Sequence, residues 1–173
     1  EKRVARYLVG PYNNSWNFME ALEKAQDGYT IEFENGYVFQ WPTDEVIVIN
    51  KSLHFVGHVV SNPNGNGRMF NNTIEASFRF VEGAQVTFED LWFKVGGNYT
   101  TLLLWNSSDI ICKQVYFEAT TPTNNEFFIY MDTHSKLTLE GVGMKVPEKH
   151  QSAIGMSASE LSIRNSTIFS KID

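Results

Sequence analysis

The sequence predicts an all-β fold, a parallel β-helix with three short strands per coil and an N-terminal capping α-helix. Three observations predict it. A nine-residue pattern, here called the phrase, occurs four times, and apolar side chains alternate with a period of two residues inside each copy. In addition, one segment near the start has apolar residues at helical spacing. Repeats of 20 to 50 residues are typical of solenoids, propellers and arrays. A repeat near 24 residues is too short for a helix pair of the usual families, but it is long enough for one coil of short strands.

The four copies of the phrase read alike and are evenly spaced. "VTFEDLWFK" begins at Val86, "IICKQVYFE" at Ile110, "LTLEGVGMK" at Leu137 and "LSIRNSTIF" at Leu161, so the starts are 24, 27 and 24 residues apart. Each copy has two apolar residues two apart, then a polar pair, then a second alternating stretch.

The alternation predicts three strands per coil, each buried on one face. The inward pairs of the first strands are Val86 and Phe88, Ile110 and Cys112, Leu137 and Leu139, and Leu161 and Ile163. Those of the second strands are Leu91 and Phe93, Val115 and Phe117, Val142 and Met144, and Ser166 and Ile168. Those of a third strand, which precedes each phrase, are Phe78 and Phe80, Leu102 and Leu104, Ile129 and Met131, and Ile154 and Met156. Equivalent residues of successive coils are then stacked about 4.8 Å apart.

The polar pairs support this register. Glu89, Lys113, Glu140 and Arg164 occupy equivalent positions, and their charges alternate in sign. Opposite charges on neighbouring strands stabilise a sheet by up to about 1 kcal/mol each, whereas like charges destabilise it. The alternative reading is a solvated turn.

Earlier coils precede the four phrases. "LHFVGHV", which starts at Leu53, matches the phrase at Val86, and Gly57 falls where Asp90 does. The separation of 33 residues exceeds one plain coil, and the excess is a loop over 61–67, rich in Asn and Gly. Strands within 29–39 and 44–50 complete the first coil, so that coils are expected over 29–169.

One segment reads as a helix. Trp16, Met19 and Leu22 fall at helical spacing, and we expect a capping helix over residues 14–27 with Ser15 at its start and Gly28 at its end. Such a helix would cover the open first coil of the solenoid. After Phe169 nothing covers the last coil, so we expect further coils or another subunit there. Residues 1–173 are then one β-helix domain, a fragment of a longer chain.

Composition excludes several classes of protein. The formal net charge of −6 argues against a nucleic-acid partner. No apolar stretch is long enough to span a membrane, so no membrane partner is expected either. Cys112 is the lone cysteine, which excludes an internal disulfide and a cysteine zinc cluster. Because Cys112 falls at an inward position, we expect a buried structural thiol.

The sequence resembles the right-handed β-helix proteins of the pectate-lyase-like superfamily. The segment "SWNFMEALEKAQDGYTIEFENGYVF" is similar to their capping helix and first strand, and "KSLHFVGHV" is similar to their following coil. The resemblance extends from Trp16 to Ile168 and implies a pectin-lyase-type fold. Together with the rule for parallel crossovers, it implies a right-handed coil.

The catalytic motifs of that superfamily are not found. The lyases use calcium-binding acidic residues and an arginine or lysine base, and the hydrolases use a cluster of aspartates. This sequence has no Asp-Asp pair, Asn-Thr-Asp, Gly-His-Gly, Arg-Ile-Lys or Trp-Ile-Asp-His. Glu118 and Asp132 are weak catalytic candidates, because two carboxylates at suitable separation can act as acid and base. The simpler reading is two solvated turn residues.

Four histidines, His54, His58, His134 and His150, show no metal-ligand spacing, so no metal and no cofactor are expected. Three outward aromatics, Trp92, Tyr116 and Tyr130, are instead the candidate binding residues. Trp92 and Tyr116 are equivalent in consecutive coils, so they would form a flat apolar strip for a sugar ring or a protein. The alternative is that they pack under a loop or on each other. Leu103 is also outward and apolar.

These observations lead to one functional prediction and two alternatives. We expect a non-catalytic binding or scaffold module of a larger bacterial protein, with a polysaccharide or protein partner. One alternative is a carbohydrate-active enzyme, a polysaccharide lyase or glycoside hydrolase, because superfamily membership would support it. The other is a sensor or adaptor domain preceding a catalytic domain such as an ATPase.

Overall fold

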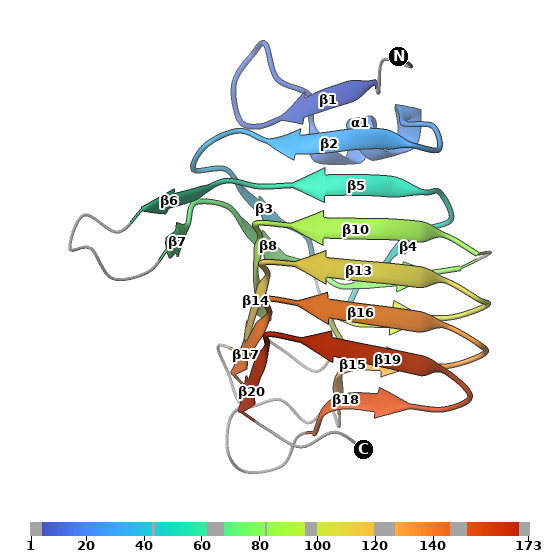
Figure 1. Ribbon diagram of the computed structural model, residues 1–173. Helices are drawn as coiled ribbons and strands as arrows, with labels where there is room; N and C mark the ends of the chain where they lie inside the picture. The colour runs from blue at the N-terminus through green and yellow to red at the C-terminus, as the bar shows by residue number, and fades with distance from the viewer. Residues whose placement is uncertain are drawn as a thin grey trace.

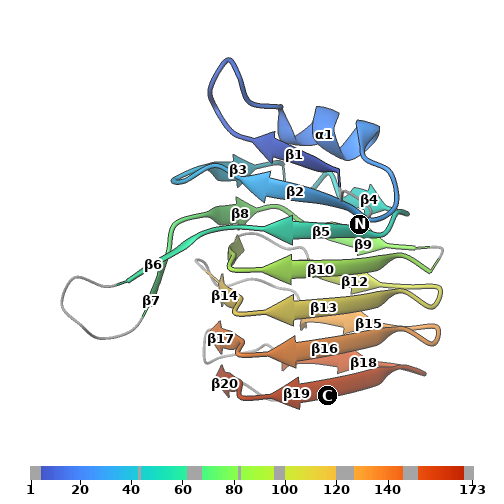
Figure 2. The same cartoon turned by 45° about the horizontal axis from the view of Figure 1, so that its top comes forward.

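The chain folds as a right-handed parallel β-helix of about six turns, which confirms the predicted fold class (Figure 1). The computed structural model describes residues 5–42, 44–61, 68–81, 83–95, 100–119, 127–145 and 152–169. Three parallel sheets form the walls of the solenoid, and each coil contributes one strand in turn to each sheet. The strands of successive coils lie one below the other from the N-terminal to the C-terminal end (Figures 1 and 2).

The three sheets, here called sheets A, B and C, have seven, six and five strands. Sheet A holds β1 (Arg6–Val9), β2 (Tyr29–Phe33), β5 (Leu53–Val56), β10 (Gln85–Glu89), β13 (Asp109–Lys113), β16 (Lys136–Glu140) and β19 (Glu160–Arg164). Sheet B holds β3 (Val38–Gln40), β8 (Thr73–Glu75), β11 (Trp92–Val95), β14 (Tyr116–Ala119), β17 (Gly143–Lys145) and β20 (Thr167–Phe169). Sheet C holds β4 (Ile47–Ile49), β9 (Phe78–Phe80), β12 (Leu102–Leu104), β15 (Phe127–Met131) and β18 (Ser152–Met156).

The register is the one predicted from the repeated phrase. In sheet A, Glu89 is the partner of Lys113, Lys113 of Glu140, and Glu140 of Arg164, so the alternating charges are neighbours on the outer face. The predicted inward pairs of sheets B and C are also in register across neighbouring coils. One line of equivalent residues thus runs through the stack at each position of the phrase.

Stacked aromatic rings occupy the upper part of the core. The fully buried Phe55 lies between Phe18 and Phe88, with ring centroids 5.8 Å and 5.1 Å apart. Phe93 and Phe117 are stacked at 4.9 Å with an interplanar angle of 11°. Phe18 belongs to α1, and the other rings come from three successive coils, so burial of these side chains ties the helix and the coils together.

The N-terminal cap is built differently from the prediction. Helix α1 spans Phe18–Lys24, inside the predicted range 14–27. Its N-cap is Asn17, whose side chain accepts a hydrogen bond from the Met19 N–H, and its C-cap is Ala25. The assignment of Ser15 and Gly28 to the helix ends was therefore wrong. Ser15 instead donates a hydrogen bond of 2.5 Å to a carboxylate oxygen of Glu34.

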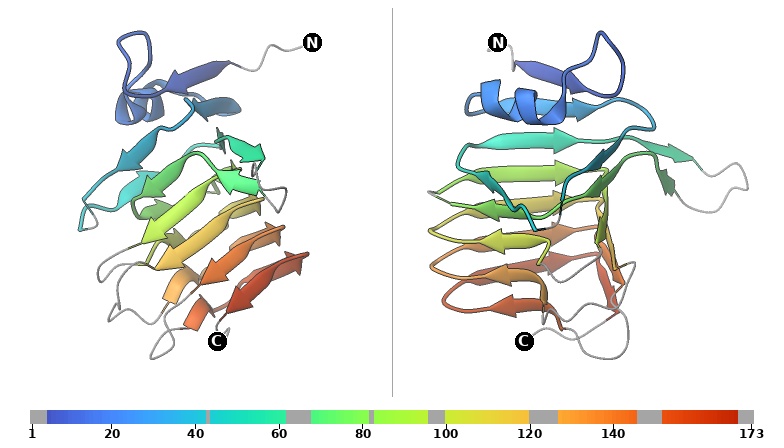
Figure 3. Two further views of the ribbon diagram at one scale, coloured as in Figure 1. Left: turned by 90° about the vertical axis from the view of Figure 1, so that its left-hand side faces the viewer. Right: turned by 180° about the vertical axis from the view of Figure 1, so that it is seen from behind.

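Strand β1 is an element that the sequence did not predict. It pairs in parallel with β2, outside the first complete coil, and α1 covers the core beside it (Figure 3). Three residues of the helix are buried: Phe18, Ala21 and Leu22. The N-terminal end of the solenoid is thus closed by a strand as well as a helix.

An antiparallel hairpin projects from the second coil. Strands β6 (Val59–Ser61) and β7 (Arg68–Phe70) flank the predicted loop, whose residues 62–67 lie outside the described ranges. The hairpin extends away from the stack on the side of sheet B (Figure 1). It explains why this coil is longer than the others.

Candidate functional site

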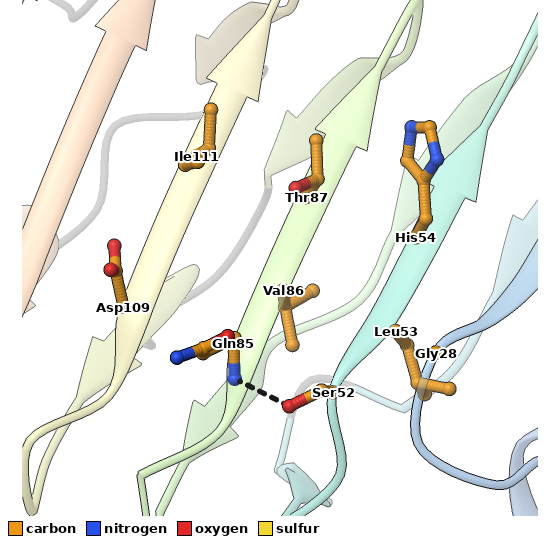
Figure 4. A pocket seen from close by; sticks show the side chains of 9 residues that line it. All are labelled: Gly28, Ser52, Leu53, His54, Gln85, Val86, Thr87, Asp109 and Ile111. Carbon is orange, nitrogen blue, oxygen red and sulfur yellow. Dashed lines mark hydrogen bonds between the residues drawn. The ribbon is translucent and has the colours of Figure 1, made fainter.

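A shallow hollow lies on the outer face of sheet A, across the strands β5, β10 and β13. Its volume is about 290 Å³. Two rows of side chains line it. The first row is Ser52, Gln85 and Asp109, and the second row is His54, Thr87 and Ile111 (Figure 4). We call this feature the sheet A hollow.

The period of the strand explains why these residues share one face. Gln85, Thr87 and Glu89 alternate with the buried Val86 and Phe88, so the odd-numbered residues of β10 all point outwards. The same alternation turns Asp109 and Ile111 outwards on β13. Three strands about 4.8 Å apart give the hollow a width of about 10 Å. At its upper edge stands Gly28, which has no side chain to close it.

Hydrogen bonds hold the upper wall of the hollow. The Gln85 N–H donates to the Ser52 hydroxyl at 3.2 Å, and the Ser52 N–H donates to a carboxylate oxygen of Asp27 at 2.8 Å. The His54 imidazole lies 2.9 Å from a carboxylate oxygen of Glu89, measured from Nε2 to Oε2. The backbone and the imidazole are therefore positioned before any ligand arrives.

The hollow presents hydrogen-bonding groups next to a small apolar surface. Thr87 supplies a hydroxyl, Gln85 an amide and Asp109 a carboxylate, while Ile111 supplies the apolar contact. The lining contains no lysine or arginine, so it offers an anionic ligand no permanent positive charge. A neutral ligand with many hydroxyl groups fits this chemistry best.

The structure does not bring Glu118 and Asp132 together. Glu118 lies on the outer face of sheet B, in β14, whereas Asp132 follows β15 at the far end of sheet C. The two carboxylates therefore belong to different walls of the solenoid. A carboxylate oxygen of Asp132 accepts the Thr133 N–H at 2.7 Å, which is the arrangement of a turn residue.

Trp92 and Tyr116 do come together, as partners in β11 and β14. Their ring centroids are 5.8 Å apart and their planes are at 76°, so the pair is edge-to-face rather than a flat strip. Phe70 of the hairpin stacks on Tyr116 at 6.4 Å, and the Lys94 ammonium lies 4.3 Å from the Trp92 ring centroid. We call these four side chains the sheet B aromatic cluster.

The surroundings of Tyr116 show what the cluster does for the sheet. A Cβ atom on Gly143, the partner of Tyr116 in the next coil, would lie 2.7 Å from the Tyr116 ring. The ring thus covers the glycine, whose missing side chain provides the space. Burial, and next the nearby Glu118 carboxylate, raise the pKa of the Tyr116 phenol.

The third aromatic candidate, Tyr130, is on another wall. It projects from the outer face of sheet C, in line with Leu103 and Gly155 of the neighbouring strands. Trp92 and Tyr116 belong to sheet B, so the three predicted binding residues do not form one site.

Cys112 lies inside the solenoid, as predicted. Its side chain is fully buried in sheet A, and this burial raises the pKa of the thiol far above its usual range. A thiol in this position is a packing residue rather than a nucleophile.

The histidines are scattered. His54 and His58 are near carboxylates of different coils, Glu89 and Glu32 respectively, and His134 lies in a turn with a φ of 59°. His150 lies outside the described residues. Within the described ranges, no three His, Cys, Asp or Glu side chains are grouped so as to hold a metal ion. No helix in the described part of the chain is long and apolar enough to cross a membrane.

The fold defines the chain as a parallel β-solenoid protein. No family model, curated protein or solved structure matches it.

The sheet A hollow was not predicted from the sequence. The residues that line it alternate correctly, but an outward polar residue of a strand carries no motif of its own. The available signal was the register, because aligning the phrases at Val86 and Ile110 places Gln85 beside Asp109 and Thr87 beside Ile111. Whether such a row of outward residues encloses a hollow depends on the side-chain conformations, and the sequence pattern does not determine these.

Proposed function

We propose that this chain is a non-catalytic binding module, whose sheet A hollow binds a neutral polysaccharide. The observation that carries the proposal is the composition of the lining, in which a hydroxyl, an amide, a carboxylate and an imidazole converge beside Ile111 on a rigid sheet. Hydroxyl-rich ligands are recognised by such planar polar groups next to an apolar contact. The sheet A hollow is shallow and lies on the outer face of a sheet, so a polymer bound there can extend beyond the site.

We further propose that the chain belongs to the pectate-lyase-like superfamily. The capping helix followed by the first parallel coil supports this assignment, together with the "DG-T-I" entry into β2. The proposed ligand class differs from that of lyases acting on acidic polymers. Asp109 would repel a polyanion, and no basic side chain lines the hollow to offset the repulsion.

The absence of turnover is part of the proposal. The two candidate carboxylates belong to different sheets, because Glu118 lies in β14 of sheet B and Asp132 follows β15 of sheet C. A glycosidase needs two carboxyl groups within about 10 Å of each other across one bond. We propose that neither residue is catalytic.

Calorimetric titration with soluble neutral polysaccharides, and with polygalacturonate as the acidic counterpart, tests the function. We expect binding of a neutral polymer with no new reducing ends after long incubation. Release of reducing ends or of unsaturated products would show that the enzyme alternative is right. Stronger binding of polygalacturonate, or no binding of any glycan, would contradict the proposed ligand.

A matched pair of variants locates the site. Thr87→Ala removes a hydroxyl inside the sheet A hollow, and Thr138→Ala removes an equivalent outward hydroxyl from β16, outside it. We expect Thr87→Ala to raise the Kd about three- to tenfold, the usual effect of one lost hydrogen bond, and Thr138→Ala to leave it unchanged. Equal effects of the two variants would place the ligand elsewhere.

A further inference from the structure

The sheet A hollow is longer along the axis of the solenoid than along its strands. Four successive coils line it, and they place at one equivalent position Gly28, Ser52, Gln85 and Asp109 (Figure 4). Three interstrand spacings separate Gly28 from Asp109, a distance of about 14 Å. Along a single strand the lining runs only from Gln85 to Thr87, which is about 7 Å. The hollow is therefore a trough that lies parallel to the axis.

The walls of this trough repeat from coil to coil. The two rows of side chains that line the hollow form the walls, and each of the coils that carry β5, β10 and β13 contributes one side chain to each wall. A ligand in the trough therefore meets an equivalent pair of positions at every interstrand spacing of about 4.8 Å. A linear polymer can repeat its contacts there if each of its units advances by about the same distance.

The two ends of the trough differ. Gly28 lies at the upper end, and nothing lies within 4 Å of the Cβ position of this glycine, so this end is open. In the coil after Asp109 the equivalent residue is Lys136, whose ammonium lies 3.7 Å from a carboxylate oxygen of Glu160. Neither residue of this ion pair lines the hollow. The trough thus spans the coils between Gly28 and Lys136, which is room for about three units of a polymer that advances by one interstrand spacing per unit.

We propose that the ligand of the trough is an extended neutral glycan with equatorial 1,4 linkages, a β-1,4-linked glucan or mannan, which lies parallel to the solenoid axis with one sugar per coil. This inference rests on the function proposed above. In such a glycan the rings follow one another in a straight, flat ribbon, and each ring advances by about one interstrand spacing. Chains with axial 1,4 linkages or with 1,3 linkages curve, so they would leave a straight trough before its end.

The chemistry of a flat ribbon also fits the two walls. Most hydroxyl groups of the ribbon project from its edges, where the Gln85 amide, the Thr87 hydroxyl and the Asp109 carboxylate can bind them. The faces of the rings carry C–H groups, which can contact the apolar side chain of Ile111. Polar edges and apolar faces of one ligand are thus matched by the same short segment of sheet A.

Calorimetric titration with oligosaccharides of one to six sugars tests the length and the linkage. For at least one β-1,4-linked series, gluco- or manno-oligosaccharides, we expect the Kd to fall at least about tenfold between one and three sugars and to change little beyond, because about three rings contact the trough. The α-1,4-linked malto-oligosaccharides of the same lengths should not gain affinity in this way. Equal gains for both linkages, or no gain with length, would overturn the inference but leave a neutral-glycan site in place. If no glycan binds, the proposed function itself is contradicted, and this inference with it.

Three variants test the direction in which the ligand lies. His54 and Ile111 belong to the same wall, two interstrand spacings apart, whereas Lys113 is the next outward residue of β13 after Ile111 and lies outside the hollow. An axial ligand contacts the first two residues, so His54→Ala and Ile111→Ala should each raise the Kd of the six-sugar ligand about three- to tenfold, and Lys113→Met should leave it unchanged. A ligand that lies along β13 would be weakened by Ile111→Ala and Lys113→Met but not by His54→Ala, and this result would overturn the axial arrangement.

Discussion

Single residues at the corner between sheets A and B determine how closely the coils can stack. Asp90, Gln114, Gly141 and Asn165 occupy this corner in successive coils, and all four have left-handed backbone with φ between 48° and 64°. The N–H groups of Asp90, Gln114 and Gly141 donate along the stack, as from Gln114 to the Glu140 carbonyl at 2.9 Å. Asn and Asp tolerate this conformation better than most residues, and Gly adopts it freely.

Gly57 occupies the same corner in the second coil for a different reason. A Cβ atom there would lie 2.3 Å from the Asp90 carbonyl oxygen and 2.7 Å from a methyl group of Leu91. The oxygen belongs to the backbone of the next coil, so it cannot move aside without shifting that coil. The close approach, rather than φ, is what requires glycine here.

The first prediction concerns this contact. Gly57→Ala should lower the free energy of unfolding by about 2 kcal/mol or more, because the added methyl group overpacks a rigid backbone. Gly36→Ala is the control: Gly36 has a φ of 80° but nothing lies within 4 Å of its Cβ position, so only the backbone strain of about 1 kcal/mol is expected. Urea denaturation of both variants measures the difference. Equal losses would show that the approach of Asp90 is unimportant.

At the scale of elements, the cap is held by one lysine of the following coil. Helix α1 has seven residues and is too short to be stable alone. The Lys51 ammonium donates to the carbonyl oxygens of Leu22 at 2.7 Å and Glu23 at 2.8 Å, in the last turn of the helix. A positive charge at this end also complements the helix dipole.

The second prediction follows from these two hydrogen bonds. Lys51→Met keeps the aliphatic chain but removes the donor, and should lower the free energy of unfolding by about 1 to 2 kcal/mol. Lys113→Met removes an exposed lysine from the outer face of sheet A and should cost less than about 0.5 kcal/mol. Thermal unfolding followed by circular dichroism compares them. If the two variants lose the same stability, Lys51 does not hold the helix.

The elements that the sequence predicted are those that repeat. Strands β10 to β20 come from the four copies of the phrase and the segments between them. Each copy could be aligned with the others, so the strand assignment in one copy supported the assignment in the next. The predicted register from Val86 to Ile163 is confirmed. Strand β1 and the hairpin of β6 and β7 occur once each, and neither has a copy with which to align it. The helix was predicted, but its predicted cap residues were wrong. Ser15 and Asn17 are both good N-cap residues, so the sequence does not choose between them. The tertiary contact of Ser15 with Glu34 distinguishes them.

The candidate site was less predictable than the fold for a similar reason. Pairing of Trp92 with Tyr116 follows from the repeat alone and is confirmed. The edge-to-face angle, and the contact with Phe70, depend on a hairpin whose path has no counterpart in other coils. Outward side chains obey the register but are not constrained by a common core.

The whole molecule is a stack in which each coil is buried mainly by its neighbours. Cys112 lies in the fourth coil, with Phe88 of the third and Leu139 of the fifth as its register partners. Its thiol is fully buried, and burial raises its pKa. A reagent can reach this sulfur only when the adjacent coils separate.

The third prediction uses this thiol to report on the stack. In the folded protein Cys112 should react with a bulky aromatic disulfide at least about a thousandfold more slowly than in denaturant, since reaction requires opening of a core region. The Gly57→Ala variant, which weakens the second coil, should label faster if the coils open together. Reaction of the native thiol at the rate of a free cysteine would mean that Cys112 faces outwards and that the register of β13 is wrong.

The direction of the interstrand hydrogen bonds has a mechanical consequence. They run along the axis of the stack, and β1 and β20 lie at its opposite ends (Figure 1). A pulling force applied to the two ends of the chain therefore loads the bonds of one strand after another rather than all together. Such a stack yields like a zipper, coil by coil from an end, and lengthens under weak tension instead of resisting until a single rupture.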